Sequence, residues 1–125
     1  MFDRIKASGI KWALHQDGVH IAAHNPWFAL HYAITGLNVV GVDINAGQHL
    51  TRQEALYAYT RGASWYANRE NELGSIEAGK FADLLVLDKD YFSVPDADVR
   101  TIRPVLTIVN GDIVHDTGVV RQRGN

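Results

Sequence analysis

The chain contains no cysteine, which excludes disulfide bonds and thiolate metal sites and leaves the redox compartment open. No apolar run approaches the ~20 residues that cross a bilayer, and Met1–Lys6 lacks the apolar stretch of a signal peptide. The formal net charge is only −2, so there is no electrostatic argument for binding nucleic acid or an anionic membrane. We therefore expect a cytoplasmic protein that binds neither.

The composition is that of an ordinary globular domain. Hydrophobic residues make up 46% of the 125 residues and charged residues 21%. A chain of this length can bury a core of its own. No internal repeat or low-complexity segment interrupts it.

Three segments carry helix signals. Phe2–Ser8 ends at Gly9, a residue that commonly stops helices. Asn25–Pro26 predicts a helix start, with Asn as N-cap and Pro at the first helical position. Thr51–Glu54 has the pattern of a capping box, and we expect the helix that it opens to run to about residue 68. A glycine inside that helix, Gly62, suggests the close approach of another helix.

The strand signals lie at the beginning and in the second half of the chain. Ile10–Gln16 is apolar on both faces, as in a strand covered on both sides. Ala82–Leu87 is a short apolar run, and Pro95–Asp98 is expected to be a surface loop. Asn110–Gly111 between two apolar runs predicts a β-hairpin, because both residues tolerate the positive φ of a type I′ turn. A change of character near residue 70 separates an α/β part, 1–70, from a β part, 71–125.

Four segments together resemble the C-terminal part of a known family. The run 74–83 reads G-S-I-E-x-G-K-x-A-D, and 50–63 reads L-T-x-Q-E-A-L…Y-T…G-A. They follow Asn25–Trp27 and the segment that ends at Asp17, in the order found in the amidohydrolase superfamily. The chain is most similar to the amidohydrolase-3 branch of metal-dependent hydrolases, over about residues 10–116.

This resemblance implies a fold and a division of the chain. Residues 1–70 would be the last strand and helices of a partial (β/α)8 barrel, and 71–125 a β segment of a composite β-sandwich with a hairpin. A complete barrel of this type has roughly 250 residues, about twice the length of this chain. The 74–83 motif has a structural explanation, because Gly74 and Gly79 allow backbone angles closed to other residues.

Asp17 is the residue that the resemblance assigns to chemistry. It matches an aspartate at the end of the eighth strand that binds a zinc-like divalent metal and moves a proton from metal-activated water to the leaving group. The residues before it are commonly small in the family, whereas here they are His15 and Gln16. In a strand His15 would share a face with Asp17 and is a weaker candidate metal ligand. A turn-forming role for Asp17 beside Gly18 is the simpler alternative.

The remaining histidines give one further alternative. His15, Asp17, His20 and His24 form a dense run of possible ligands and could bind a metal by themselves. We expect a partly buried position on a helix for His31. His49 and His115 are expected at the surface.

The missing segments matter as much as those present. The family's first-strand His-x-His pair and its other metal ligands have no counterpart. We therefore expect a C-terminal part of a metal-dependent amidohydrolase that acts on non-peptide C–N bonds of small molecules. Alone it would be inactive and without metal. The alternative is a free-standing module that self-associates or binds a partner. Both readings predict a homo-oligomer, because strands without neighbours leave unpaired edges.

Overall fold

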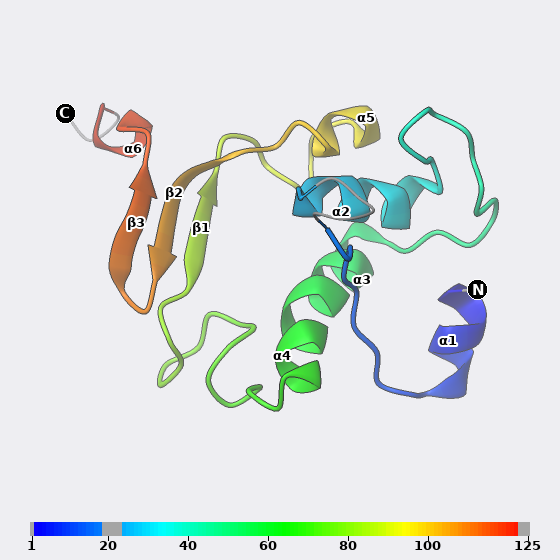
Figure 1. Cartoon of the computed structure of the whole chain (residues 1–125), viewed down its shortest axis with the longest axis horizontal. Coiled ribbons are helices and arrows are strands. Elements are labelled where there is room, and N and C mark those ends of the chain that lie inside the picture. Colours follow the sequence, from blue (N-terminus) through cyan, green and yellow to red (C-terminus); the bar gives the residue numbers. More distant parts are fainter. Residues whose placement is uncertain (1, 19–23, 123–125) are drawn as a thin grey trace.

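The computed structural model describes residues 2–18 and 24–122. Figure 1 shows helices α1 to α5 on one side and a small sheet, with α6 at its end, on the other. The elements in chain order are α1 (Phe2–Ser8), α2 (Pro26–Thr35), α3 (Arg52–Tyr57), the π-helical turn η1 (Ala58–Gly62), α4 (Ala63–Tyr66), β1 (Leu84–Leu87), α5 (Asp96–Val99), β2 (Pro104–Val109), β3 (Asp112–Asp116) and α6 (Val119–Gln122). Among these residues, no helix has the length and apolar character to cross a membrane.

The predicted helix starts are confirmed in atomic detail. The Asn25 side chain accepts the Trp27 N–H at 3.0 Å at the start of α2. Thr51 and Glu54 form the capping box, with the Glu54 N–H donating to Thr51 Oγ1 at 3.1 Å and the Thr51 N–H donating to Glu54 Oε2 at 2.8 Å. These bonds satisfy backbone donors that the first turn of a helix leaves free.

The helix that begins after Thr51 is less regular than expected. It passes through the π-helical turn η1 and ends at Tyr66, slightly before the predicted end. Gly62 lies in that turn, where an added Cβ would stand 2.6 Å from the Trp12 carbonyl oxygen. The close neighbour of Gly62 is therefore the extended segment before Asp17 and not a second helix.

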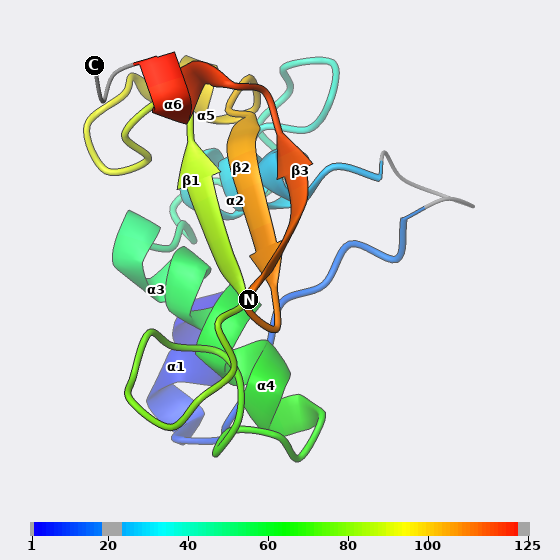
Figure 2. The same cartoon turned by 90° about the vertical axis from the view of Figure 1, so that its left-hand side faces the viewer.

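The sheet is antiparallel with strand order β1-β2-β3. Leu85 pairs with Thr107, and Thr107 pairs with His115. Asn110 and Gly111 have φ values of 51° and 87°, so the predicted hairpin is confirmed with positive φ at both turn residues. In the view of Figure 2 the sheet lies in front of the helices and turns one broad face away from them.

Two expectations are wrong. Residues 10–17 form no strand; the Leu14 N–H donates instead to the Ala58 carbonyl at 3.1 Å. Strand hydrogen bonds need a neighbouring strand, and within the described residues this segment has none. Pro95–Asp98 is also not simply a loop, because α5 begins at Asp96. The structure shows a three-stranded antiparallel sheet with helices, and the expected barrel end is not established by it.

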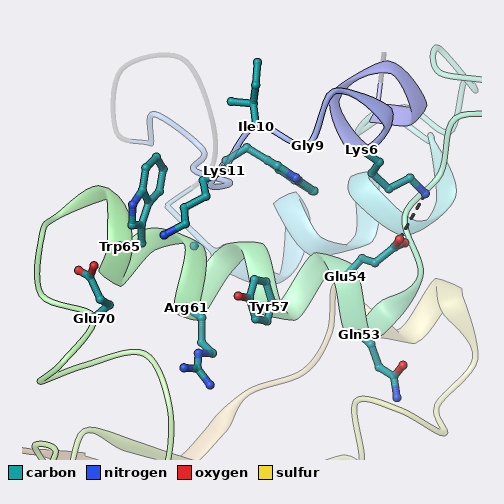
Figure 3. Close-up of a pocket in the computed structure, with 12 residues that line it drawn as sticks. Lys6, Gly9, Ile10, Lys11, Gln53, Glu54, Tyr57, Arg61, Trp65 and Glu70 are labelled. Carbon is teal, nitrogen blue, oxygen red and sulfur yellow. Dashed lines mark ion pairs between the residues drawn. The ribbon is translucent and has the colours of Figure 1, made fainter.

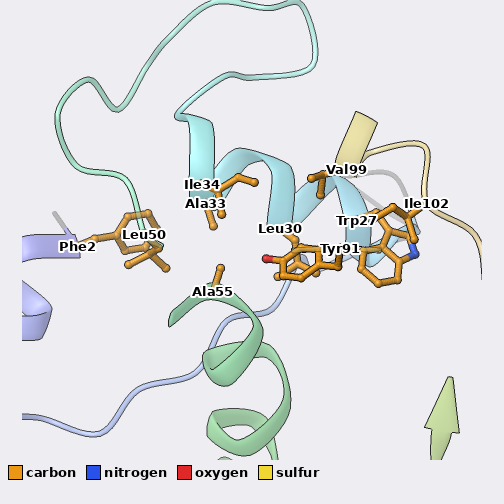
Figure 4. Packing of buried hydrophobic residues seen from close by; sticks show 10 residues of the cluster. All are labelled: Phe2, Trp27, Leu30, Ala33, Ile34, Leu50, Ala55, Tyr91, Val99 and Ile102. Atoms are coloured by element: carbon orange, nitrogen blue, oxygen red, sulfur yellow. The ribbon is translucent and has the colours of Figure 1, made fainter. Parts of the chain in front are cut away.

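The hydrophobic core lies in the helical part of the molecule (Figure 4). Leu30 and Ala55 bring α2 and α3 together, and Trp27 packs on Tyr91 with ring centroids 6.0 Å apart. Arg52 joins α3 to the chain after β1, since its guanidinium donates to the Tyr91 and Val94 carbonyls and pairs with Asp96 at 2.6 Å. The core thereby includes residues from both sides of the predicted boundary near residue 70.

Candidate functional site

Asp17 ends the extended segment that follows α1. Its side chain is exposed, and its backbone adopts a φ of 48°. Aspartate is one of the few residues that enter this left-handed region at modest cost. The geometry agrees with the turn that Asp17–Gly18 predicts, and it leaves the carboxylate free to meet other groups. The chain continues into residues 19–23, which lie outside the described part.

The residues before Asp17 hold the segment in place. The Gln16 amide lies 3.1 Å from the Tyr59 hydroxyl. In the amide orientation that satisfies both ends of the side chain, the Gln16 nitrogen donates to the Asn25 carbonyl at 2.9 Å. The Gln16 oxygen then accepts the Asn25 N–H at 3.2 Å. Burial raises the pKa of Tyr59, so this hydroxyl keeps its proton. Gln16 therefore fixes the backbone next to Asp17 to the N-cap of α2 and to η1.

One histidine of the described residues lies close to the Asp17–Gly18 turn: His24 Cδ2 stands 3.2 Å from the position that a Cβ on Gly18 would occupy. His15 and His24 are both exposed, and His20 lies outside the described part. Within residues 2–18 and 24–122, no three His, Asp or Glu side chains form a group that could hold a metal ion. A site made from His15, Asp17, His20 and His24 remains a hypothesis. A divalent metal would need ligands besides Asp17 and His15, because one carboxylate and one imidazole fall short of the usual coordination.

His15 opens instead into a cleft between α2 and the loop that follows it. This α2 cleft has a volume of about 370 Å³. Its polar lining consists of His15, Gln16, His31, Tyr32, Asn38 and Arg100. Its apolar lining includes Phe28, Leu37, Val39 and Ile44. The cleft is open to solvent on one side, where Val39 and Ile44 are exposed, and its volume and mixed lining fall within the range of small-molecule sites.

His31 is the most buried polar residue of the α2 cleft, with 6% of its surface exposed. Burial lowers its pKa, the positive charge of Arg100 lowers it further, and Asp96 acts in the opposite direction. The imidazole is therefore neutral near pH 7. The prediction of a partly buried helix position was close. No local pattern indicated that Arg100, 69 residues later in the chain, lines the same cleft.

A second and larger hollow, the α4 groove, has a volume of about 700 Å³. Figure 3 shows Tyr57, Arg61 and Trp65 along one wall and Ile10 and Lys11 along the other. Lys6 and Glu54 close one end with an ion pair at 3.3 Å. Asp17 does not line the α4 groove, so this groove is separate from the candidate catalytic residue.

The 74–83 motif builds a rigid turn. The Lys80 ammonium is nearly buried and donates to Ser75 Oγ and the Glu70 carbonyl, both at 2.7 Å. Gly74 has a φ of 89° and packs so closely on Ser64 that a Cβ there would collide with the Ser64 hydroxyl. This close packing, and not a reaction, explains why the motif needs Lys80 and Gly74.

His49 and His115 are exposed, as expected. His49 lies 3.9 Å from Asp43 in the loop after α2. His115 lies on β3, opposite Thr107. Neither belongs to the α2 cleft.

Comparison with known proteins places these features in a family context. The family model described as "Amidohydrolase family" matches residues 2–115. An N-substituted formamide deformylase of Arthrobacter pascens is 32% identical over 107 residues, which cover 83% of this chain and 19% of that protein. An imidazolonepropionase of Bdellovibrio bacteriovorus is 36% identical over 94 residues, covering 72% and 22%. A putative amidohydrolase of Bacillus subtilis, YtcJ, is 32% identical over 76 residues, covering 61% and 14%.

The chain thus spans about a fifth of the length of the first two relatives. No solved structure matches it significantly.

Proposed function

Because the chain belongs to the amidohydrolase family, we propose that it is the C-terminal part of a metal-dependent hydrolase that cleaves non-peptide C–N bonds of small molecules. The matched residues run from α1 to β3. Two of the relatives are named as a formamide deformylase and an imidazolonepropionase. The observation that carries the proposal is this match over nearly the whole chain, joined to an exposed carboxylate at the end of the segment that Gln16 anchors.

Asp17 is the residue to which we assign chemistry. In the complete enzyme a divalent metal, when bound, would supply an activated water. The Asp17 carboxylate would bind that metal and carry a proton from the water to the leaving nitrogen. The Asp17 side chain is exposed, and the neighbouring Gln16 is held by Tyr59. Both features suit a carboxylate that would share a metal with ligands from other strands.

The chain alone is expected to be inactive. The described residues form no group that could hold a metal ion, and the substrate pocket of a barrel enzyme is built by loops from all eight strands. The metal ligands and most of the pocket would come from sequence outside these 125 residues. We also propose that the protein is soluble and lies in the cytoplasm.

The test is a hydrolase assay of the longer parent polypeptide with N-substituted formamides. Asp17→Asn is expected to lower kcat roughly 10²- to 10⁴-fold, the range for loss of a proton-transferring group. Asp112→Asn, the same change at an exposed position on β3, is the matched control and should leave kcat unchanged. Equal activity of the Asp17→Asn variant and the wild type would refute the role of Asp17.

Self-association is a second candidate function, favoured by the surface of the sheet. Leu85, Val86, Ile113 and Val114 are all exposed. Unpaired strand edges and exposed apolar side chains promote association with another copy of the chain. We expect a dimer or larger oligomer, and a monomeric mass by light scattering at micromolar concentration would count against it.

A further inference from the structure

We propose that the α2 cleft binds a small organic anion with an apolar body, such as an aryl carboxylate or a branched alkyl carboxylate. The cleft belongs to the chain itself and requires no other domain. Three observations support it: the charge of its lining, the position of its apolar walls and the rigidity of the loop that bounds it.

The charge of the lining favours an anion. Arg100 is the one permanently charged residue that lines the cleft, and no Asp or Glu of the described residues lines it. A guanidinium presents two parallel N–H donors, which match the two oxygens of a carboxylate. The side-chain nitrogen of Asn38, whose oxygen accepts the Val40 and Val42 N–H groups, offers a further donor on the same lining.

The apolar walls favour a hydrocarbon body. Phe28 on α2 stands with Val39 and Ile44 of the following loop around the same hollow. A volume of about 370 Å³ falls at the small end of ligand pockets. It accommodates a single ring or a short branched chain.

The loop that bounds the cleft is already ordered by its own hydrogen bonds. Asn38 accepts the Val40 and Val42 N–H groups on its side chain, each at 3.0 Å, and donates its own N–H to the Val42 carbonyl at 2.9 Å. The Ile44 N–H donates to the Gly36 carbonyl at 3.1 Å. A preformed wall lowers the ordering cost of binding.

The cleft adjoins the candidate catalytic residue without containing it. His15 and Gln16 line the cleft and directly precede Asp17, which does not line it. The idea that this anion is part of the hydrolase substrate rests on the proposed function. The binding of an anion by the 125-residue chain does not depend on the proposed function.

The experiment is an NMR titration of the full 125-residue chain with benzoate, with neutral benzamide as the matched ligand. We expect saturable shifts at residues of the α2 cleft, and binding of benzoate at least tenfold tighter than that of benzamide. His31 provides a second readout. An anion beside Arg100 should raise the His31 pKa, because the Arg100 charge lowers that pKa and the anion offsets this charge. Asp96 also acts on His31, in the raising direction, and His15 and Tyr32 line the same cleft.

Arg100→Gln should abolish the preference for benzoate while leaving benzamide binding unchanged. Arg4→Gln makes the same change at a residue that lines a separate hollow on α1 and should bind benzoate like the wild type. An unchanged thermal unfolding midpoint for both variants confirms that they fold. No saturable benzoate binding, or an equal benzoate preference in the Arg100→Gln variant, would overturn the proposal. Asp17→Asn should bind benzoate normally, which separates failure of this inference from failure of the proposed hydrolase.

Discussion

Apolar side chains are buried in the helical part and largely exposed on the sheet. Ile102, after α5, is 0% exposed within the core, whereas Ile113 on β3 is 55% exposed. Both regions carry clear local sequence signals, a capping box in one and an Asn-Gly hairpin in the other. Local signals therefore determined both secondary structures. Among the described residues, the buried cluster is built from α1, α2, α3 and the chain before β2, together with Leu50.

Truncation of the same residue type in each region should give the largest difference in stability. Ile102→Ala should lower the free energy of unfolding by about 2–5 kcal/mol, because it leaves a cavity in a packed core. At a protein concentration low enough to keep the chain monomeric, Ile113→Ala should lower it by less than about 0.5 kcal/mol, as for most surface substitutions. Urea unfolding of both variants measures the difference. Similar losses in the monomer would contradict the exposed position of Ile113, whereas a larger Ile113→Ala loss only at high concentration would support association through the sheet.

The 74–83 turn connects the two regions, and its glycines can be separated by their surroundings. Gly79→Ala should cost about 1–2 kcal/mol, since its φ is 91° and its neighbourhood is otherwise open. Gly74→Ala has a similar φ cost and should lose a further amount of about 1–3 kcal/mol from the collision with Ser64. Thermal unfolding compares the two variants. A Gly74→Ala variant no less stable than Gly79→Ala would contradict the close packing of this turn on α4.

The capping box gives the smallest expected effect and a dependence on pH. Hydrogen bonds from Thr51 are the main reason why the Glu54 pKa is lowered from its ordinary value of 4.5. A lowered pKa in the folded state means that Glu54 stabilises the protein above about pH 4.5, and that this contribution is lost as the pH falls through the folded pKa.

Glu54→Gln tests this directly. The wild type should be more stable than the variant at pH 7 by roughly a few tenths of a kcal/mol, because Glu54 is partly exposed. The difference should shrink as the pH falls through the lowered folded-state pKa of Glu54. Glu72→Gln, which removes an exposed partner of Arg69, is the matched control. A difference that grows toward low pH would contradict the sign of the pKa shift.

Features set by neighbours in sequence were predictable. The capping box at Thr51, the helix start at Asn25 and the hairpin at Asn110 each depend on residues within four positions. The extended backbone of Ile10–Gln16, which forms no strand, was not predictable, because a strand forms only where another strand pairs with it. The same limit applies to the candidate site: Asp17 was found through family resemblance, whereas Arg100 reaches the α2 cleft only through packing of α2 against α5.

The native mass and metal content of the purified 125-residue chain distinguish an enzyme part from a metal protein in its own right. We propose that the chain is one part of a metal-dependent hydrolase and holds only a minority of the metal ligands. This proposal predicts an oligomeric mass with no stoichiometric metal after dialysis. One firmly bound zinc ion per chain, lost in the His20→Ala variant, would contradict it and would identify His15, Asp17, His20 and His24 as a metal site in their own right.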